Sequence, residues 1–206
     1  MNFKLITSDT YNGLDILPTR FPGEEKRSDI LDKIFELMLY MLQRHNKVLQ
    51  TRFDLHYPDI NGFEYLNRDI YNFSNEFCKA LNRKYISGHF VDVKYIWARE
   101  QKIDKNPHYH FVVFCNGNAI QNPFTIFKEA HHYWAKTIGY PSEGLIDYCF
   151  RNNGKNHDNG IMIRKDREDH EANIKKAYRA ASYLAKIGTK DIRDKYSCSF
   201  GSSHVS

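Results

Sequence analysis

The chain has 206 residues, of which 41% are hydrophobic and 15% aromatic, and these values are typical of a folded globular protein with one domain. Its mean hydropathy of -0.65, without a long apolar stretch or a signal-peptide pattern, excludes a membrane protein, so we expect it in the cytoplasm. Thirty basic and 25 acidic residues give a net charge of +5, which favours a polyanionic partner. The four cysteines are far apart and indicate neither disulfides nor a cysteine zinc site.

Hydrophobic periodicity predicts alternating helices and strands along most of the chain. Apolar residues at helical spacing predict helices at 29–45, 63–84, 125–136 and 171–187. Short apolar or alternating runs between turn residues predict strands at 48–55, 90–101, 108–115, 145–150 and 160–165. This order predicts an α+β fold with a central, mainly antiparallel sheet of about five strands flanked by helices. We divide the chain into an N-terminal extension with one helix, residues 1–46, and a domain over residues 47–206.

Two histidines lie one residue apart on a predicted strand, in the sequence His108-Tyr109-His110. Alternate side chains of a strand share a face, so the two imidazoles project together. A three-residue turn at 104–106 would place Glu100 opposite His110 on that face. Two imidazoles and a carboxylate, with positions left for water and substrate, suit Mg²⁺ or Mn²⁺ acting on a phosphate, and zinc would also fit. The opposing interpretation is an incidental pair, because the chain has ten histidines.

The last predicted helix carries a basic stripe around one tyrosine. At about 100° per residue, Lys176, Arg179, Lys186 and Lys190 fall on the same stripe as Tyr183. A phenol has an unperturbed pKa of about 10, so nearby cations favour the phenolate that a nucleophile needs. Lys186 lies one turn away and is well placed for this role. The alternative is a solvent-exposed basic face that contains a tyrosine.

These motifs together, in this order, resemble the HUH endonuclease superfamily. Within it, the chain is similar over about residues 48–202 to the inovirus and prophage replication proteins of the YagK/YfjJ C-terminal-domain type. The segments that carry the resemblance are Trp97-Ala98-Arg99-Glu100, Pro107-His108-Tyr109-His110, Tyr183-Leu184-Ala185-Lys186 and Ser199-Phe200-Gly201-Ser202.

The resemblance implies an enzyme that nicks and joins single-stranded DNA and initiates rolling-circle replication of a phage, prophage or plasmid in a bacterial host. It implies that His108, His110 and Glu100 hold Mg²⁺ or Mn²⁺, that Tyr183 forms a 5′-phosphotyrosyl intermediate, and that Lys186 is the motif lysine. The implied partners are single-stranded DNA at a replication origin and a host helicase and polymerase, with no membrane.

The strand at 52–55 departs from the resemblance, because many rolling-circle initiators have a threonine-rich first motif there. We therefore treat Asp54 and Arg52 as candidate supports of the metal ligands and give His56 a surface or packing role. Tyr178 lies about 140° around the helix from Tyr183, which favours a single-tyrosine enzyme. We assign DNA contacts to Lys176, Arg179, Lys190, Arg164 and Arg52.

Three other interpretations stay open. A relaxase or a transposase of the same superfamily would use the same chemistry, although the chain is short for a relaxase. A non-catalytic regulator would bind single-stranded DNA without forming an adduct. A zinc-dependent hydrolase or structural zinc protein would use the histidine pair and would not depend on Tyr183.

Overall fold

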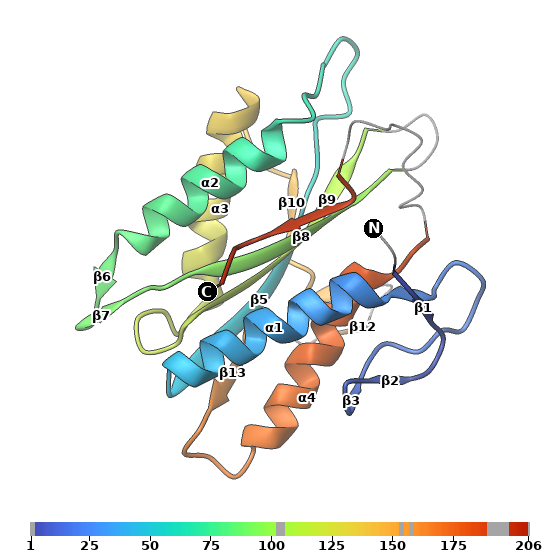
Figure 1. Cartoon of the computed structure of the whole chain (residues 1–206). Coiled ribbons are helices and arrows are strands. Elements are labelled where there is room, and N and C mark those ends of the chain that lie inside the picture. The colour runs from blue at the N-terminus through green and yellow to red at the C-terminus, as the bar shows by residue number, and fades with distance from the viewer. Residues whose placement is uncertain (1–2, 102–105, 153–154, 157–158, 189–197, 206) are drawn as a thin grey trace.

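An antiparallel sheet with helices on both faces organises the computed structural model, which describes residues 3–101, 106–152, 155–156, 159–188 and 198–205 (Figure 1). Within these residues the sheet has six strands, and five of them follow the order β10-β5-β9-β8-β14. The sixth strand, β13, pairs with β5 on the same edge as β10. The strands are β5 (Lys47–Leu55), β8 (Lys94–Glu100), β9 (His108–Asn116), β10 (Ile146–Asp147), β13 (Ile161–Arg164) and β14 (Phe200–Ser202). The predicted α+β class is confirmed.

One face of the sheet packs against α2 (Asp69–Asn82) and α3 (Pro123–Ile138), as Figure 1 shows. Aromatic rings fill this layer, and Phe53 of β5 stacks on Phe111 of β9 with centroids 5.1 Å apart. Burying such rings is the main apolar contribution to a core of this kind. This layer therefore holds the central strands β5 and β9 at a fixed register.

The opposite face packs against α1 (Ser28–Arg44) and α4 (His170–Ala181). Side chains alternate between the faces, so Val112 and Phe114 of β9 point into this layer while Phe111 points away. Helix α1 buries the stripe predicted from its spacing, and its bounds differ from the predicted ones by one residue at each end. His108 and His110 share the phase of Val112 and thus lie on the α1 and α4 face.

Helix α2 is shorter than the predicted helix at 63–84. Asp69 explains the late start, because its Oδ2 accepts hydrogen bonds from the backbone N–H of Leu66 at 2.9 Å and from the Tyr57 hydroxyl at 3.2 Å. These bonds hold the preceding chain in a turn. Leu66, which lies within the predicted helix, is exposed.

The C-terminal helix also ends earlier than predicted. Helix α4 stops at Ala181, and a 3-10 turn, η1 (Ser182–Ala185), follows. The Ser182 hydroxyl donates to the carbonyl of Arg179 at 2.7 Å and accepts from the backbone N–H of Leu17 at 2.9 Å. A serine side chain that bonds its own preceding turn competes with helix continuation. The predicted continuous stripe at 171–187 is therefore broken just before Tyr183.

Small strands complete the described structure. The predicted strand at 90–101 begins only at Lys94, because residues 89–90 pair with residues 85–86 in a separate hairpin. Its turn is formed by Ser87 and Gly88, both at positive φ. The predicted strand at 145–150 shortens to β10, because Cys149 adopts a left-handed conformation, φ 55°. The small strands are β1 (Leu5–Ile6), β2 (Thr10–Tyr11), β3 (Leu14–Asp15), β4 (Lys26–Arg27), β6 (Tyr85–Ile86), β7 (His89–Phe90), β11 (Arg151–Asn152) and β12 (Lys155–Asn156).

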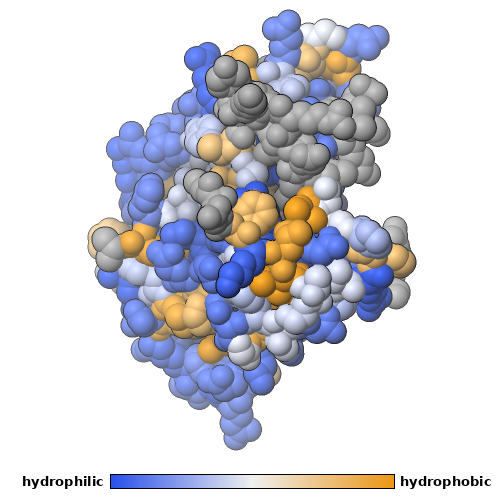
Figure 2. Space-filling model, turned by 45° about the vertical axis from the view of Figure 1, so that its right-hand side comes forward, coloured by the Kyte–Doolittle hydropathy of each residue, from blue (hydrophilic) through white to orange (hydrophobic). Residues whose placement is uncertain are grey.

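Hydrophilic residues predominate on the face shown in Figure 2. Among the described residues, no helix combines the length and the apolar character needed to span a bilayer. The edge strand β14 packs closely on β8, since a Cβ on Gly201 would lie 2.6 Å from the ring of Trp97. This contact gives a steric reason for glycine in the segment 199–202.

Candidate functional site

The pairing of β8 with β9 brings Glu100 next to both histidines. Glu100 lies opposite His108, not opposite His110 as predicted, so the register differs from the prediction by two residues. The connection runs from residue 101 to 107 and is longer than a three-residue turn; most of the predicted turn at 104–106 falls outside the described residues. A shift of two residues preserves the face of every side chain. Glu100 consequently stays on the histidine face.

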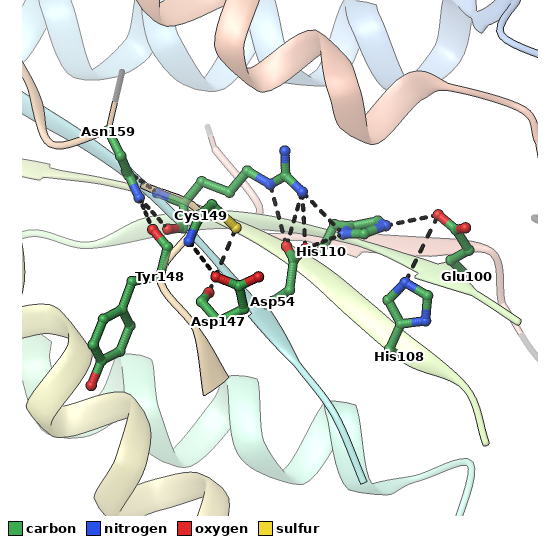
Figure 3. A network of polar contacts seen from close by, with 9 residues as sticks. Asp54, Glu100, His108, His110, Asp147, Tyr148, Cys149 and Asn159 are labelled. Carbon is green, nitrogen blue, oxygen red and sulfur yellow. Dashed lines mark hydrogen bonds and ion pairs between the residues drawn. The ribbon is translucent and has the colours of Figure 1, made fainter. Parts of the chain in front are cut away.

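The three side chains form a group that can hold a metal ion (Figure 3). The Glu100 Oε2 atom lies 2.8 Å from His110 Nε2 and 3.9 Å from His108 Nε2, and one ligand atom from each residue lies within 4.8 Å of the others. His110 is buried, whereas Glu100 and His108 keep about a fifth of their side chains exposed, 19% and 21%. Two nitrogens and one carboxylate fit a divalent cation with positions open toward solvent.

His108 has the protonation state that metal binding requires. Burial, reinforced by His110, lowers the pKa of His108 to about 4, although Glu100 acts in the opposite direction. The imidazole is therefore neutral at physiological pH, and a neutral nitrogen has the lone pair that a metal accepts.

Asp54 orients His110 from the neighbouring strand. It lies opposite His110 in the pairing of β5 with β9, and its Oδ2 is 2.9 Å from His110 Nδ1. We assign the Nδ1 proton to this contact, because it is shorter than the 3.3 Å between His110 Nδ1 and Arg52. A carboxylate bonded to Nδ1–H fixes the tautomer and leaves Nε2 to a metal. Asp54 therefore contacts a histidine of the metal group, and its supporting role stays a prediction.

Arg52 joins the metal group to the tyrosine. Its guanidinium pairs with Asp54 at 2.9 Å and lies over the ring of Tyr183, 3.9 Å from the centroid. Burial alone would raise the pKa of Asp54, but Arg52 and the hydrogen bond from His110 hold it well below its usual range. Asp54 is thus an anion held between a cation and an imidazole.

Asn159 fixes the backbone of Arg52 at a gap in the sheet edge. Strand β13 pairs with residues 47–50 and β10 with residues 54–55, so neither covers Arg52. The Asn159 side chain accepts from the Arg52 N–H at 2.8 Å and donates to its carbonyl at 2.6 Å. A side-chain amide here replaces the hydrogen bonds of a missing strand residue.

The Tyr183 ring meets His110 edge to face, with centroids 4.9 Å apart. The histidine motif and the tyrosine turn, 73 positions apart, therefore meet in space. Burial raises the pKa of Tyr183, Arg52 lowers it, and Glu100 raises it again, with a net increase. The guanidinium of Arg52 lies over the ring, 3.9 Å from its centroid, whereas the sequence predicted that Lys186 would be the cation beside the phenol.

Residues of the N-terminal segment hold the turn that carries Tyr183. The backbone N–H of Ile187 donates to Glu25 at 2.8 Å, and that of Gly188 donates to Gly23 at 2.6 Å. Lys186 forms an ion pair with Glu24, with 2.9 Å between Nζ and Oε1. Burial lowers the pKa of Lys186, but the bond to Glu24 outweighs this effect and raises it. The segment around Glu24 was not recognised from the sequence.

The structure does not gather all of the predicted DNA-binding residues. Lys176 and Arg179 are exposed on α4, outside the contacts of the metal group. Arg164 pairs with Lys47, at the opposite end of β5 from Asp54, and Lys190 lies outside the described residues. Of the predicted residues that the structure describes, only Arg52 touches the site.

Tyr178 and His56 both pack against other aromatic rings. Tyr178 is fully buried under α1, where its ring meets Phe35 at 5.9 Å and its hydroxyl donates to the Leu31 carbonyl at 3.4 Å. His56 stacks on His108 with centroids 5.1 Å apart and an interplanar angle of 14°. His56 therefore packs against a histidine of the metal group.

Fold and site define a class, an α+β protein with a His-His-Glu group beside a half-buried tyrosine on a 3-10 turn. A family model described as the YagK/YfjJ C-terminal domain matches residues 7–203, and the chain belongs to this family. The match includes residues 7–47, which the resemblance seen in the sequence did not cover. We found no significant match among curated proteins or among solved structures.

Proposed function

We propose that this protein is a metal-dependent endonuclease of the HUH type that nicks and rejoins single-stranded DNA through Tyr183. The observation that carries the proposal is the contact of one tyrosine ring with both His110, 4.9 Å away, and Arg52, 3.9 Å away. A nucleophile must lie beside the group that binds the reacting phosphate. Membership of the YagK/YfjJ C-terminal-domain family and the net charge of +5 support a DNA substrate.

Glu100, His108 and His110 would hold Mg²⁺ or Mn²⁺, which would supply positive charge that polarises the scissile phosphate and favours the phenolate of Tyr183. Asp54 keeps His110 in the tautomer whose Nε2 faces Glu100. Arg52 opposes the burial that disfavours the Tyr183 phenolate.

The proposed step is a transesterification. The Tyr183 oxygen loses its proton and bonds to phosphorus, while the bond from phosphorus to the 3′ oxygen breaks and that oxygen gains a proton. The products are a 5′-phosphotyrosyl ester and a free 3′-hydroxyl. Because the bond energy is kept in the ester, attack by a 3′-hydroxyl rejoins the strand. Such chemistry suits the initiation and closure of rolling-circle replication, with an origin strand as substrate and a helicase and polymerase as partners.

Nicking can be tested with single-stranded origin DNA labelled at one end and Mn²⁺. The wild-type chain should produce a shorter labelled strand and a protein-linked strand, and Tyr183→Phe should produce neither. Tyr178→Phe is the matched control, because this buried tyrosine loses only the long 3.4 Å bond to the Leu31 carbonyl. Equal nicking by wild type and Tyr183→Phe would contradict the proposal and favour a metal-dependent hydrolase.

A further inference from the structure

An open hollow of about 700 Å³ lies beside the metal group at the β10 edge of the sheet. His56 lines the hollow, and its ring stacks directly on the ring of His108. Figure 3 shows Asp147 and Tyr148 on the far side of Asp54 from Glu100. A strand with a phosphate at the metal group would therefore place an adjoining nucleotide at this hollow. The described lining residues are His56, Gly144, Ile146, Asp147, Tyr148 and Phe150.

The walls of the hollow are held in place by contacts behind them. Tyr148 stacks on Phe127 with centroids 4.4 Å apart, and its hydroxyl lies 2.7 Å from His131 Nε2. Asp147 Oδ1 accepts from the backbone N–H of Cys149 at 2.8 Å. Groups fixed in this way can bind a ligand without paying much ordering entropy.

The chemistry of the walls fits a base better than a phosphate. Tyr148 and Phe150 offer aromatic surface, on which any nucleobase can stack. The exposed Asp147 carboxylate repels a phosphate and accepts hydrogen bonds. Carboxylates accept from exocyclic amino groups such as that of cytosine, whereas thymine has no amino group and its one donor, N3–H, lies between two carbonyl oxygens that repel a carboxylate. Among the described lining residues there is no lysine or arginine to attract a phosphate.

We propose that this hollow binds one nucleobase next to the scissile phosphate and selects a base with an exocyclic amino group through Asp147. The proposal rests on the proposed function, which supplies the single-stranded DNA. It makes Asp147 a determinant of the nick-site sequence, separate from the residues that hold metal or attack.

Sequence selection in the Tyr183→Phe background tests the hollow without cutting the library. The protein is mixed with randomised single-stranded DNA, and the bound sequences are determined. We expect thymine to be depleted about tenfold at one position next to the bond that the wild-type chain cuts. Asp147→Asn should accept thymine there, because an amide can both donate and accept, and Phe150→Ala should lose the preference at that position alone. Glu143→Gln, an exposed neighbour outside the lining, is the control.

Adduct formation by the wild-type chain, measured in parallel, separates the two proposals. Unchanged base preferences in Asp147→Asn and Phe150→Ala, together with a normal adduct, would overturn the base site and leave the proposed function intact. A preference that changes as expected at one position of the bound sequences, without any adduct, would overturn the nicking activity and support the base site. A chain that binds no single-stranded DNA would overturn both.

Discussion

The guanidinium of Arg52 lies over the ring of Tyr183, with 3.9 Å between the guanidinium carbon and the ring centroid. Contacts of this type contribute about 0.5 to 2 kcal/mol, with the larger values at desolvated sites. Arg52 also pairs with Asp54, which in turn bonds His110. The tyrosine, the arginine and the metal group are therefore linked by direct contacts, and a change at Arg52 should affect both ends.

Arg52→Gln should raise the pKa of Tyr183 further and slow adduct formation. The guanidinium is the largest influence that lowers this pKa, against burial that raises it. Each unit of increase lowers the phenolate fraction about tenfold. Ultraviolet titration of the phenol and single-turnover adduct rates measure the two effects. Arg83→Gln, at an exposed position just after α2 on the opposite face of the sheet, should change neither. An unchanged phenol pKa in Arg52→Gln would contradict this role.

Asp54→Asn should weaken Mn²⁺ binding about 10- to 100-fold, because residues that orient a ligating histidine typically have effects of this size. Asp54 bonds His110 Nδ1 at 2.9 Å and does not belong to the metal group itself. Calorimetric titration gives the affinity directly. Asp166→Asn removes an exposed carboxylate and should leave the affinity unchanged. If both variants bind Mn²⁺ like the wild type, Asp54 does not orient the site.

The metal-free protein should lose stability as the pH falls from about 6.5 to about 4. Burial holds the pKa of His108 at about 4 in the fold, below its ordinary value of 6.5, so the unfolded chain binds more protons in this window. The stability that is present above pH 6.5 is therefore lost as the pH falls to about 4, and this loss is at most about 3 kcal/mol. Thermal unfolding of wild type and His108→Asn in chelator measures the effect. The variant should show a flatter pH profile, and equal profiles would contradict the shift.

Ser182→Ala should destabilise the turn that carries Tyr183. The Ser182 hydroxyl is fully buried and accepts from the Leu17 N–H, which the alanine leaves without this partner. Loss of such a bond costs about 1 to 3 kcal/mol. Urea unfolding gives the free energy, and the adduct rate should fall with it. Ser8→Ala, which removes an exposed hydroxyl, is the control and should cost far less. Equal stability of the two variants would show that the bond between Ser182 and Leu17 does not stabilise the turn.

Local periodicity was sufficient to predict the elements that carry the metal group. The strand with His108 and His110 was predicted correctly at its start, and α1 within one residue, because both have strong apolar patterns. The register of Glu100 was missed by two residues, since loop length is not encoded in strand alternation. Because the difference is an even number of residues, Glu100 nevertheless lies on the predicted face of the sheet.

Contacts between distant segments account for the rest. The pairing of Glu24 with Lys186 joins residues 162 positions apart, and nothing in either local pattern indicates it. Asn159 is recognisable only once the edge gap between β13 and β10 is known. The sequence could have indicated that His56 lies near the site, because it shares the strand phase of Arg52 and Asp54.

The proposed function depends on the covalent attachment of Tyr183 to DNA at the metal group. Peptide mapping by mass spectrometry, after incubation with single-stranded origin DNA and Mn²⁺, tests it most directly. We predict a phosphodiester-linked nucleotide on the peptide that contains Tyr183, and no adduct in Tyr183→Phe or in chelator. A modified residue other than Tyr183, or the same adduct in Tyr183→Phe, would contradict the assignment of Tyr183 as the nucleophile.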